Sequence, residues 1–362
     1  MATPARDIQR ILLIRPSALG DVCRSVGVAV RLKRAFPNAR LDWLVQTGFE
    51  DAIRHHPDVD AIVPFPRRQL GFKRLLRHES SRRELLKLIR RLRNSSARLD
   101  DEPTPPEPTA SHTHDAAPSA PYDLVLDAQG LLRSALFARL TGAPIRLGDA
   151  AAREGATIFY THRTDTSAHT HTVDVMHALA DAAAASFAAA SAPIASAAPP
   201  PADPLAALRL YTHPDDDAAA LRLLTPNHEL PGDPDAEPSP PFAVLAPTSR
   251  WPGKRWPAER FAAVARALLD ERRRGAPLLE RLAIVAADNE RPQCDPIFAA
   301  FESEPRLVDL VGRTSIAQLM ALVKLSRFVL ANDSAALHIA VGFHRPLLGL
   351  FGPTRIDRVG PY

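Results

Sequence analysis

Short apolar runs recur along this chain, and each is followed by a segment with the spacing of an amphipathic helix. In the first part of the chain the runs are RILLIR (10–15), ARLDWLVQ (39–46), AIVPF (61–65) and YDLVLDAQ (122–129). A second series begins with FAVLAP at 242–247. Strands that alternate with helices form parallel sheets covered on both faces. We therefore expect an α/β protein with two Rossmann-like parallel-sheet domains that face a central cleft.

The segments between these series have compositions that do not build a hydrophobic core. Residues 100–121 are polar and rich in proline, and we expect them to form a disordered insertion. Residues 181–241 are dominated by Ala, Pro and Asp, so we expect the interdomain linker there. The chain then divides into an N-terminal domain (1–180), this linker region and a C-terminal domain (242–362). A chain of 362 residues is long enough for both domains.

Cysteine usage and the N-terminus indicate a cytoplasmic protein. Cys23 and Cys294 lie far apart and form no CxxC motif, as is typical of a reducing compartment. The first apolar run is too short for a signal peptide, and no segment has the composition of a membrane span. Two acidic, His-containing stretches, 112–115 and 213–218, lie in regions without a scaffold to fix ligand geometry. We expect no metal and no cofactor.

The basic residues are unevenly distributed. Residues 67–98 carry twelve Lys or Arg against two acids, and Leu85, Ile89 and Leu92 form an apolar stripe with helical spacing. A basic amphipathic helix is typical of contact with an anionic surface or an anionic partner, and in a cytoplasmic protein that surface would be the inner face of the cytoplasmic membrane. The plainer interpretation is a solvated helix that packs the stripe on its own domain. Nucleic acid is not expected as a partner, because the segment lacks aromatic residues interleaved for stacking.

An isolated carboxylate follows the first apolar run. Asp21 stands where a helix should begin, in a loop position that binds phosphate in many nucleotide-binding α/β proteins. Phosphate is repelled by a carboxylate, so this loop is not expected to hold one. Asp21 is either a helix cap or an acid/base group that faces a substrate.

Two stretches of the C-terminal domain are expected to bind phosphate groups, such as those of a diphosphate. After the strand 242–247 come Thr248, Ser249, Arg250 and Lys254, followed by a new helix. Hydroxyls, a lysine and a helix N-terminus are the groups that bind a diphosphate. The plainer interpretation is a surface loop with incidental charges.

The second stretch is LANDSAALHIAVG, at 330–342. Asp333 and Ser334 precede a helix on which His338 lies one turn beyond Ser334. Capping and a buried histidine would explain the same pattern. Glu290, with Asp288, follows another strand at the place where a carboxylate commonly binds ribose hydroxyls, although a plain polar loop is equally compatible.

Three stretches together resemble the ADP-heptose:lipopolysaccharide heptosyltransferase family, glycosyltransferases of the GT-B fold. These are ILLIRPSALGDVCRSVGVAV, SRWPGKRWPAERF and NDSAALHIAVGFHRPLLGLFGPT. The stretches DWLVQTGFEDAIRHHPDVDAIVPFPRR and AAREGATIFYTHR look more like the branch that adds the first heptose to Kdo. The resemblance implies an inverting, metal-independent transfer of heptose from ADP-heptose to an anionic, lipid-linked Kdo–lipid A type acceptor, in lipopolysaccharide inner-core synthesis.

The resemblance also assigns roles to residues of this chain. It implies that Asp21 is the catalytic base and that Lys254, with Ser249 and Arg250 beside it, contacts the donor phosphate. It places Asp333, Ser334 and His338 in a donor-binding motif. In the same enzyme we expect the acceptor to be bound by the following residues: Ser17, Gly20, Arg67 and Arg68.

Two departures leave other functions open. The first departure is Ala335, at a position where the family usually has glycine. The second is that the sequence ends at Tyr362, where GT-B proteins usually continue, so we expect a truncated C-terminal domain. One alternative is a catalytically inactive, heptosyltransferase-like protein that binds a nucleotide sugar. Another is a different GT-B enzyme, such as a nucleotide-sugar epimerase. A dehydrogenase is disfavoured, because no GxGxxG fingerprint follows any strand.

Overall fold

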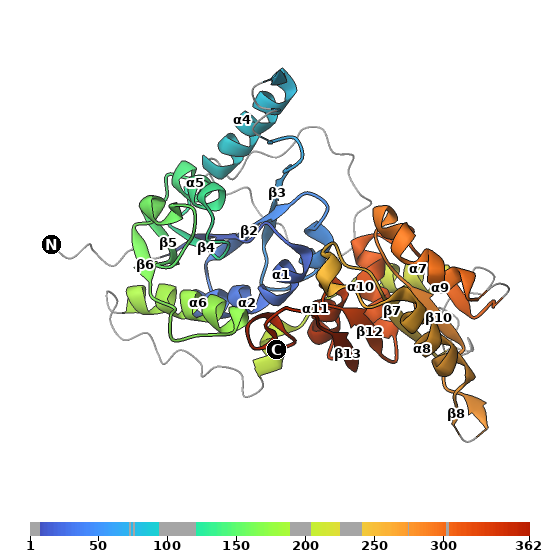
Figure 1. Cartoon of the computed structure of the whole chain (residues 1–362). Helices are drawn as coiled ribbons and strands as arrows, with labels where there is room; N and C mark the ends of the chain where they lie inside the picture. The colour runs from blue at the N-terminus through green and yellow to red at the C-terminus, as the bar shows by residue number, and fades with distance from the viewer. Residues whose placement is uncertain are drawn as a thin grey trace.

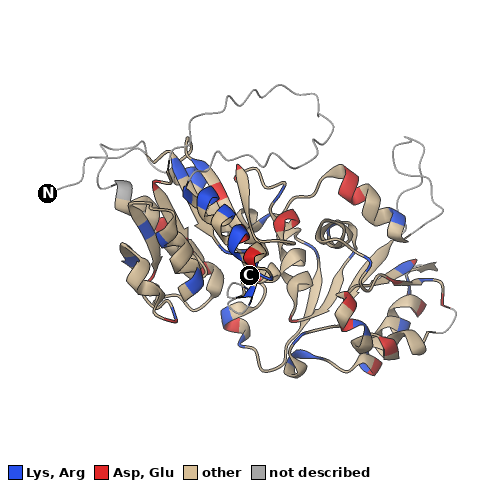
Figure 2. Cartoon of the chain, turned by 90° about the horizontal axis from the view of Figure 1, so that it is seen from above, with Lys and Arg blue, Asp and Glu red and all other residues tan. Residues whose placement is uncertain are grey.

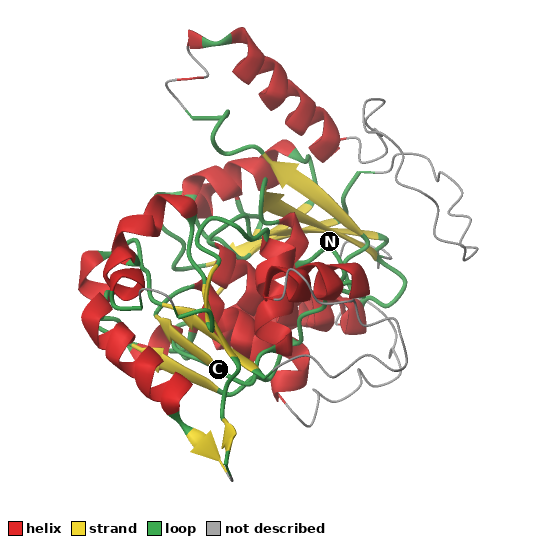
Figure 3. Ribbon diagram, turned by 90° about the vertical axis from the view of Figure 1, so that its right-hand side faces the viewer, coloured by secondary structure: helices red, strands yellow, loops and turns green. Residues whose placement is uncertain are grey.

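The computed structural model describes residues 8–71, 74, 77–93, 121–188, 204–224, 241–273, 275–301 and 304–362. These residues form two parallel sheets, each enclosed by helices (Figures 1 and 3). The prediction of an α/β protein with two parallel-sheet domains is confirmed. Almost the whole predicted insertion, 100–121, lies outside the described residues, as do parts of 67–98 and 181–241.

The first sheet has six strands in the order β3-β2-β1-β4-β5-β6. Its strands are β1 (Arg10–Ile14), β2 (Arg40–Gln46), β3 (Ala61–Phe65), β4 (Leu124–Asp127), β5 (Ile145–Asp149) and β6 (His162–Thr164). Its helices are α1 (Leu19–Arg24), α2 (Val26–Ala35), α4 (Glu79–Arg93), α5 (Leu132–Leu140) and α6 (Thr172–Ala188).

Alternation along the strands explains why helices cover both faces of this sheet. On β1, Ile11 and Leu13 face the core formed with α1, α2 and α6. Leu12 and Ile14 face the opposite core, to which α4 and α5 contribute. Strand β1 is therefore buried on both sides, as its continuous apolar run predicts.

The second sheet has five strands in the order β11-β10-β7-β12-β13. Its strands are β7 (Phe242–Ala246), β10 (Arg281–Ile284), β11 (Leu307–Asp309), β12 (Val329–Asn332) and β13 (Leu347–Leu350), with a separate hairpin of β8 (Arg272–Arg273) and β9 (Ala276–Pro277). The helices in this part are α7 (Pro214–Leu224), α8 (Ala258–Asp270), α9 (Asp295–Ala299), α10 (Ile316–Leu325), α11 (Ala335–Gly342) and α12 (Ile356–Val359).

Helix α7 lies inside the region where the composition predicts a linker, 181–241. It packs on α10, and Lys324 Nζ of α10 lies 2.6 Å from Asp217 Oδ2 of α7. The backbone N–H of Leu210 also donates to the carbonyl of Gly342, at the end of α11. We therefore propose that α7 belongs with the second sheet.

The order of the strands determines where a ligand can bind. In the first sheet β1 lies between β2 and β4, and in the second β7 lies between β10 and β12, so strand order reverses beside β1 and β7. Ligands of open parallel sheets bind at such switch points, beyond the carboxyl ends of the strands. Helix α1, which follows β1, packs against α11, which follows β12, so the two switch points lie close together (Figure 1).

Candidate active site

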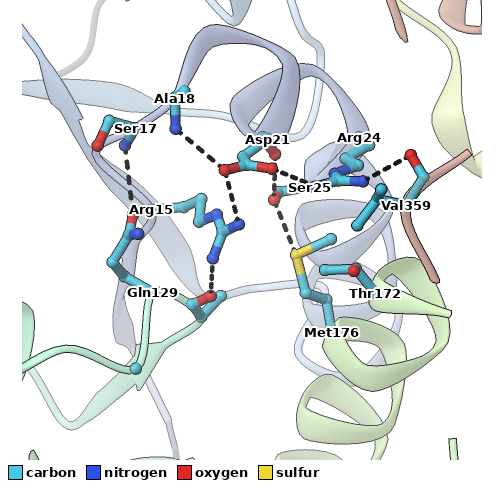
Figure 4. A network of polar contacts seen from close by, with 12 residues as sticks. Arg15, Ser17, Ala18, Asp21, Arg24, Ser25, Gln129, Thr172, Met176 and Val359 are labelled. Carbon is cyan, nitrogen blue, oxygen red and sulfur yellow. Dashed lines mark hydrogen bonds and ion pairs between the residues drawn. The ribbon is translucent and has the colours of Figure 1, made fainter. Parts of the chain in front are cut away.

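The Asp21 carboxylate lies at the start of α1 between two arginines (Figure 4). Arg15, which follows β1, places Nη2 3.2 Å from Asp21 Oδ2, and Arg24 Nη2 contacts Oδ1. The backbone N–H of Ala18 donates to Oδ2 at 3.1 Å. Asp21 thus caps its own helix and is also an ion-paired carboxylate at the carboxyl end of the central strand. The two interpretations left open by the sequence are compatible.

The arginines determine the ionisation of Asp21. Burial alone would raise its pKa, but the positive charges of Arg15 and then Arg24 outweigh burial and hold the pKa below its ordinary value. The side chain keeps 26% of its surface exposed. The carboxylate is therefore ionised at neutral pH and open to a substrate.

A second loop holds the Asp21 loop from the side of β4. Arg15 Nη1 donates to the carbonyl of Ala128, and the N–H of Ser17 donates to Gln129 Oε1 at 3.3 Å. This loop is fixed by Asp127, which is buried and accepts hydrogen bonds from Tyr160 Oη at 2.7 Å and from Ser134 Oγ at 2.8 Å. Burial raises the pKa of Asp127. The position of Asp21 thus depends on a segment more than one hundred residues away in the chain.

The predicted acceptor residues are not all in one place. Arg67, exposed after β3, directs Nη1 toward Ser17 Oγ and toward Gln46 Oε1, both at 3.4 Å. Arg68 is exposed beside it. Gly20 is buried and lies against His338 of the other sheet's helix. Ser17 and Arg67 thus meet beside the Asp21 loop, Arg68 is the next exposed residue along the chain, and Gly20 lies between the domains.

In the second sheet the loops after β7 and β10 are joined by hydrogen bonds. Thr248 Oγ1 donates to Glu290 Oε2 at 2.7 Å, and the N–H of Ser249 donates to Gln293 Oε1 at 3.2 Å. Arg250 is exposed at the rim. The structure therefore brings together Thr248 and Glu290, which the sequence analysis selected from separate stretches.

The loop after β7 also meets the start of α11. Lys254 Nζ lies 2.7 Å from Asp333 Oδ2, whose side chain is only 8% exposed. Next to Asp333, the buried Oγ of Ser334 has no hydrogen-bond partner among the described residues. An unsatisfied buried hydroxyl at a helix N-terminus, beside a lysine, is a group poised to bind an anion.

His338 connects the two halves of the site. It lies on α11, and a methyl group placed on Gly20 of α1 would stand 2.6 Å from His338 Cδ2. Burial, followed by the positive charge of Arg24, lowers the pKa of His338 to about 4. At neutral pH the ring is therefore uncharged, within the electrostatic reach of both Asp21 and Asp333.

The sequence analysis missed the residues that hold Asp21 in place. Arg24 was detectable, because it follows Asp21 by three residues on a helix and such pairs face each other. Arg15 ends an apolar run, which is a weaker signal. Gln129 and Asp127 gave no signal, since only the neighbouring position of β4 and β1 brings them to the site.

The described part of the chain contains neither a metal-binding cluster nor a membrane-spanning helix. Among these residues, no group of three or more His, Cys, Asp or Glu side chains is placed to hold a metal ion. Within the same residues, no helix combines the length and apolar character needed to cross a bilayer.

Two parallel-sheet domains meet here, with a carboxylate at one switch point and a helix N-terminus with an unpaired hydroxyl and a lysine at the other, an arrangement that suits a two-domain glycosyltransferase. Comparison with known proteins agrees, since residues 118–362 match "Glycosyltransferase family 9 (heptosyltransferase)". The chain belongs to this family and is a glycosyltransferase.

Individual relatives support the family and the fold. Lipopolysaccharide heptosyltransferase 1 of Pseudomonas aeruginosa is 26% identical over 98% of this chain and 81% of its own length. Among solved structures, E. coli ADP-heptose lipopolysaccharide heptosyltransferase II has a TM-score of 0.68 at 22% identity, over 98% of this chain and 88% of that one. E. coli heptosyltransferase WaaC with ADP also has a TM-score of 0.68, at 21% identity, over 98% of this chain and 91% of that one. At such identities these two structures establish the fold alone.

Proposed function

We propose that this glycosyltransferase transfers heptose from ADP-heptose to a Kdo–lipid A type acceptor in lipopolysaccharide inner-core synthesis. The observation that carries the proposal is the contact between Gly20 and His338, because it places the Asp21 loop beside the start of α11. The full-length similarity to a heptosyltransferase 1, and the ADP bound in a solved structure of the same fold, support the choice of substrates.

The donor occupies the second domain in this proposal. The diphosphate of ADP-heptose lies at the N-terminus of α11, where the Ser334 hydroxyl and Lys254 bind its oxygens. When the donor binds, the Lys254 ammonium group gives up part of its contact with Asp333 and forms a new contact with the phosphate. Glu290, already bonded to Thr248, accepts from the ribose hydroxyls. His338, uncharged, borders the sugar from the side of Asp21.

Asp21 acts as the general base. The acceptor hydroxyl loses its proton to the carboxylate while its oxygen forms the new bond to the anomeric carbon. The bond between that carbon and the phosphate oxygen breaks on the opposite side, ADP leaves with the electron pair, and the configuration inverts. Lys254 and the N-terminus of α11 stabilise the charge that grows on the leaving ADP, so the reaction proceeds without a metal.

The acceptor approaches across the exposed basic side of the first domain. Arg67 contacts Ser17 of the Asp21 loop, with Arg68 exposed next to it in the chain. Helix α4 stands away from the body of the molecule at the top of Figures 1 and 3. Of the predicted stripe, Leu92 lies in the domain core, together with Leu88, and Leu85 packs against it, whereas Ile89 is not part of this core. Most of the basic residues of α4 are exposed, namely Arg82, Arg83, Lys87, Arg90 and Arg93, and Figure 2 colours the Lys and Arg positions blue. We propose that they face an anionic membrane on its cytoplasmic side.

The test is donor binding followed by transfer. Calorimetry with EDTA present should give saturable binding of ADP-heptose and ADP but not of UDP or GDP. Incubation with Kdo–lipid A should then yield the heptosylated product, whose anomeric configuration NMR reads directly. Binding without transfer would identify the inactive, nucleotide-sugar-binding alternative. Transfer that stops on metal removal would contradict the metal-independent mechanism.

A further inference from the structure

The guanidinium of Arg24 lies between Asp21 and the C-terminal segment, residues 355–362 (Figure 4). Its Nη2 contacts Asp21 Oδ1, and its Nη1 donates to the backbone carbonyl of Val359 at 3.2 Å. The side chain is only 10% exposed. Arg15 holds the other carboxylate oxygen but is anchored within the first domain, on Ala128. Of these two arginines, Arg24 is the one that connects Asp21 to the end of the chain.

The C-terminal segment follows the second sheet and then crosses back onto the first domain. Thr172 Oγ1, at the start of α6, donates to the carbonyl of Arg358 at 2.8 Å. The Tyr362 hydroxyl donates to Asp174 Oδ1 at 2.6 Å, and its ring packs near His171, with 5.0 Å between the ring centroids. The segment therefore seats on α6 and holds the Val359 carbonyl over Arg24.

This inference rests on the proposed role of Asp21 as the base. We propose that Arg24 is a positioning residue for Asp21, through which the seated C-terminal segment controls how firmly the carboxylate is held. With the segment seated, Arg24 is fixed at both ends and keeps Oδ1 oriented. With the segment lifted, the guanidinium loses its carbonyl acceptor and gains water, so its hold on Asp21 weakens. Turnover is thereby coupled to the contact between the second domain and α6.

Several groups face Asp21 and bear on any pH dependence. They are Arg15 after β1, Arg24 on α1, Asp127 at the end of β4, and His338 on α11 with His171 near it. Asp127 acts through Arg15, and His338 is uncharged above a pH of about 4. Removal of Arg24 therefore leaves Arg15 as the nearest positive charge on Asp21, and the pKa of Asp21 should rise.

The main variant is Arg24→Met, measured on the full chain. We expect kcat to fall about ten- to a hundredfold, because the carboxylate is no longer oriented. The KM for ADP-heptose should stay within about twofold, and the acid limb of kcat/KM should move to higher pH. Arg24→Lys should restore part of kcat and should move the acid limb part of the way back toward its wild-type pH. Arg31→Met is the matched control, since Arg31 of α2 also bridges to α6, at Asp181, but does not contact Asp21.

A second variant tests the link to the C-terminal segment. Tyr362→Phe removes the hydrogen bond to Asp174 and should shift the acid limb in the same direction as Arg24→Met, by a smaller amount. In the Arg24→Met background the same change should have no further effect on the limb. If the effects of Tyr362→Phe and Arg24→Met on the acid limb add fully in the double variant, the proposed coupling between the C-terminal segment and Asp21 is wrong. If Arg24→Met lowers kcat but leaves the acid limb of kcat/KM at its wild-type pH, and if Arg24→Lys restores nothing, then Arg24 does not position Asp21.

A measurement of unfolding, which does not depend on catalysis, separates this inference from the proposed function. If the wild-type enzyme transfers no heptose, the proposed function fails, and Arg24 is then tested by unfolding. The free energy of unfolding of the wild type relative to Asp21→Asn should be constant above about pH 5 and should fall as the pH drops from the unfolded pKa of Asp21, about 3.9, through its lowered folded pKa. In the Arg24→Met background the folded pKa of Asp21 rises toward or past the unfolded value, so this difference should fall less, or increase, over the same pH range. Identical curves in the two backgrounds would overturn the inference.

Discussion

The ring of His338 lies directly against Gly20, so that a methyl group on Gly20 would stand 2.6 Å from His338 Cδ2. Real Cβ atoms essentially never approach other atoms so closely. The absence of a side chain at Gly20 therefore allows α1 and α11 to pack together. The proposed base and the proposed donor site are carried by these two helices.

Substitution of Gly20 by alanine should separate the two helices. Overpacking of this kind costs about 1–3 kcal/mol of unfolding free energy, and kcat should fall as Asp21 moves from α11. Urea unfolding and turnover measure the two effects. Gly71→Ala is the matched control, because a Cβ at that position meets nothing within 4 Å. Unchanged stability and turnover in Gly20→Ala would contradict a tight contact.

Replacement of Asp21 by asparagine should remove catalysis but keep the donor site. A general base contributes about a hundred- to ten-thousand-fold, so kcat should fall by a factor in this range. The affinity for ADP-heptose, measured by calorimetry, should be retained, because its proposed contacts lie in the second domain. If donor binding and turnover disappear together, Asp21 serves as a helix cap and not as a base.

Lys254→Met should weaken donor binding. The variant removes a charge-assisted contact to the diphosphate, worth about 1.5–3 kcal/mol, so the Kd for ADP should rise about ten- to a hundredfold. It also leaves Asp333 buried without its partner, which lowers stability. The double variant Lys254→Met/Asp333→Asn should regain stability but not affinity. Recovery of both would mean that Lys254 serves only its ion pair.

The pH profile of the wild type should be flat on the acid side. Asp21 works deprotonated, and its pKa lies below the ordinary value of about 3.9, while the pKa of His338 is about 4. Neither group changes charge between about pH 5 and 8. The stability contributed by ionised Asp21 is complete above the unfolded pKa and is lost as the pH falls through the lowered one. An acid limb of kcat/KM with an apparent pKa of 5–7 would contradict this assignment.

Charge reversal on α4 should reduce binding to anionic vesicles. Arg82 and Arg90 are exposed on this helix, and each basic residue near such a surface contributes about 1 kcal/mol. Arg82→Glu/Arg90→Glu should weaken co-sedimentation with phosphatidylglycerol vesicles by at least about tenfold. Arg260→Glu/Arg345→Glu changes the net charge equally in the second domain and should have little effect. Equal loss in both variants would indicate a response to net charge alone.

Local patterns in the sequence were sufficient for the class of fold. The apolar runs predict strands buried on both faces, and β1, β2, β4 and β7 are fully or nearly fully buried. Candidate residues that follow these runs were also predictable, because the carboxyl ends of parallel strands carry the ligand-binding loops. This reasoning selected Asp21, Lys254 and Ser334. Composition did not reveal helix α7, which forms from an alanine- and aspartate-rich segment at 214–224.

Only the tertiary structure decided which of these residues meet. The contact of Gly20 with His338, the ion pair of Lys254 with Asp333 and the hydrogen bond from Thr248 to Glu290 join stretches between 42 and 318 residues apart. Sequence periodicity reports which face of an element is buried, but not which distant element covers it. The ionisation of Asp21 was also decided only by the tertiary structure. It results from the balance between burial, which raises the pKa, and the two arginines that the fold places around the carboxylate, which lower it.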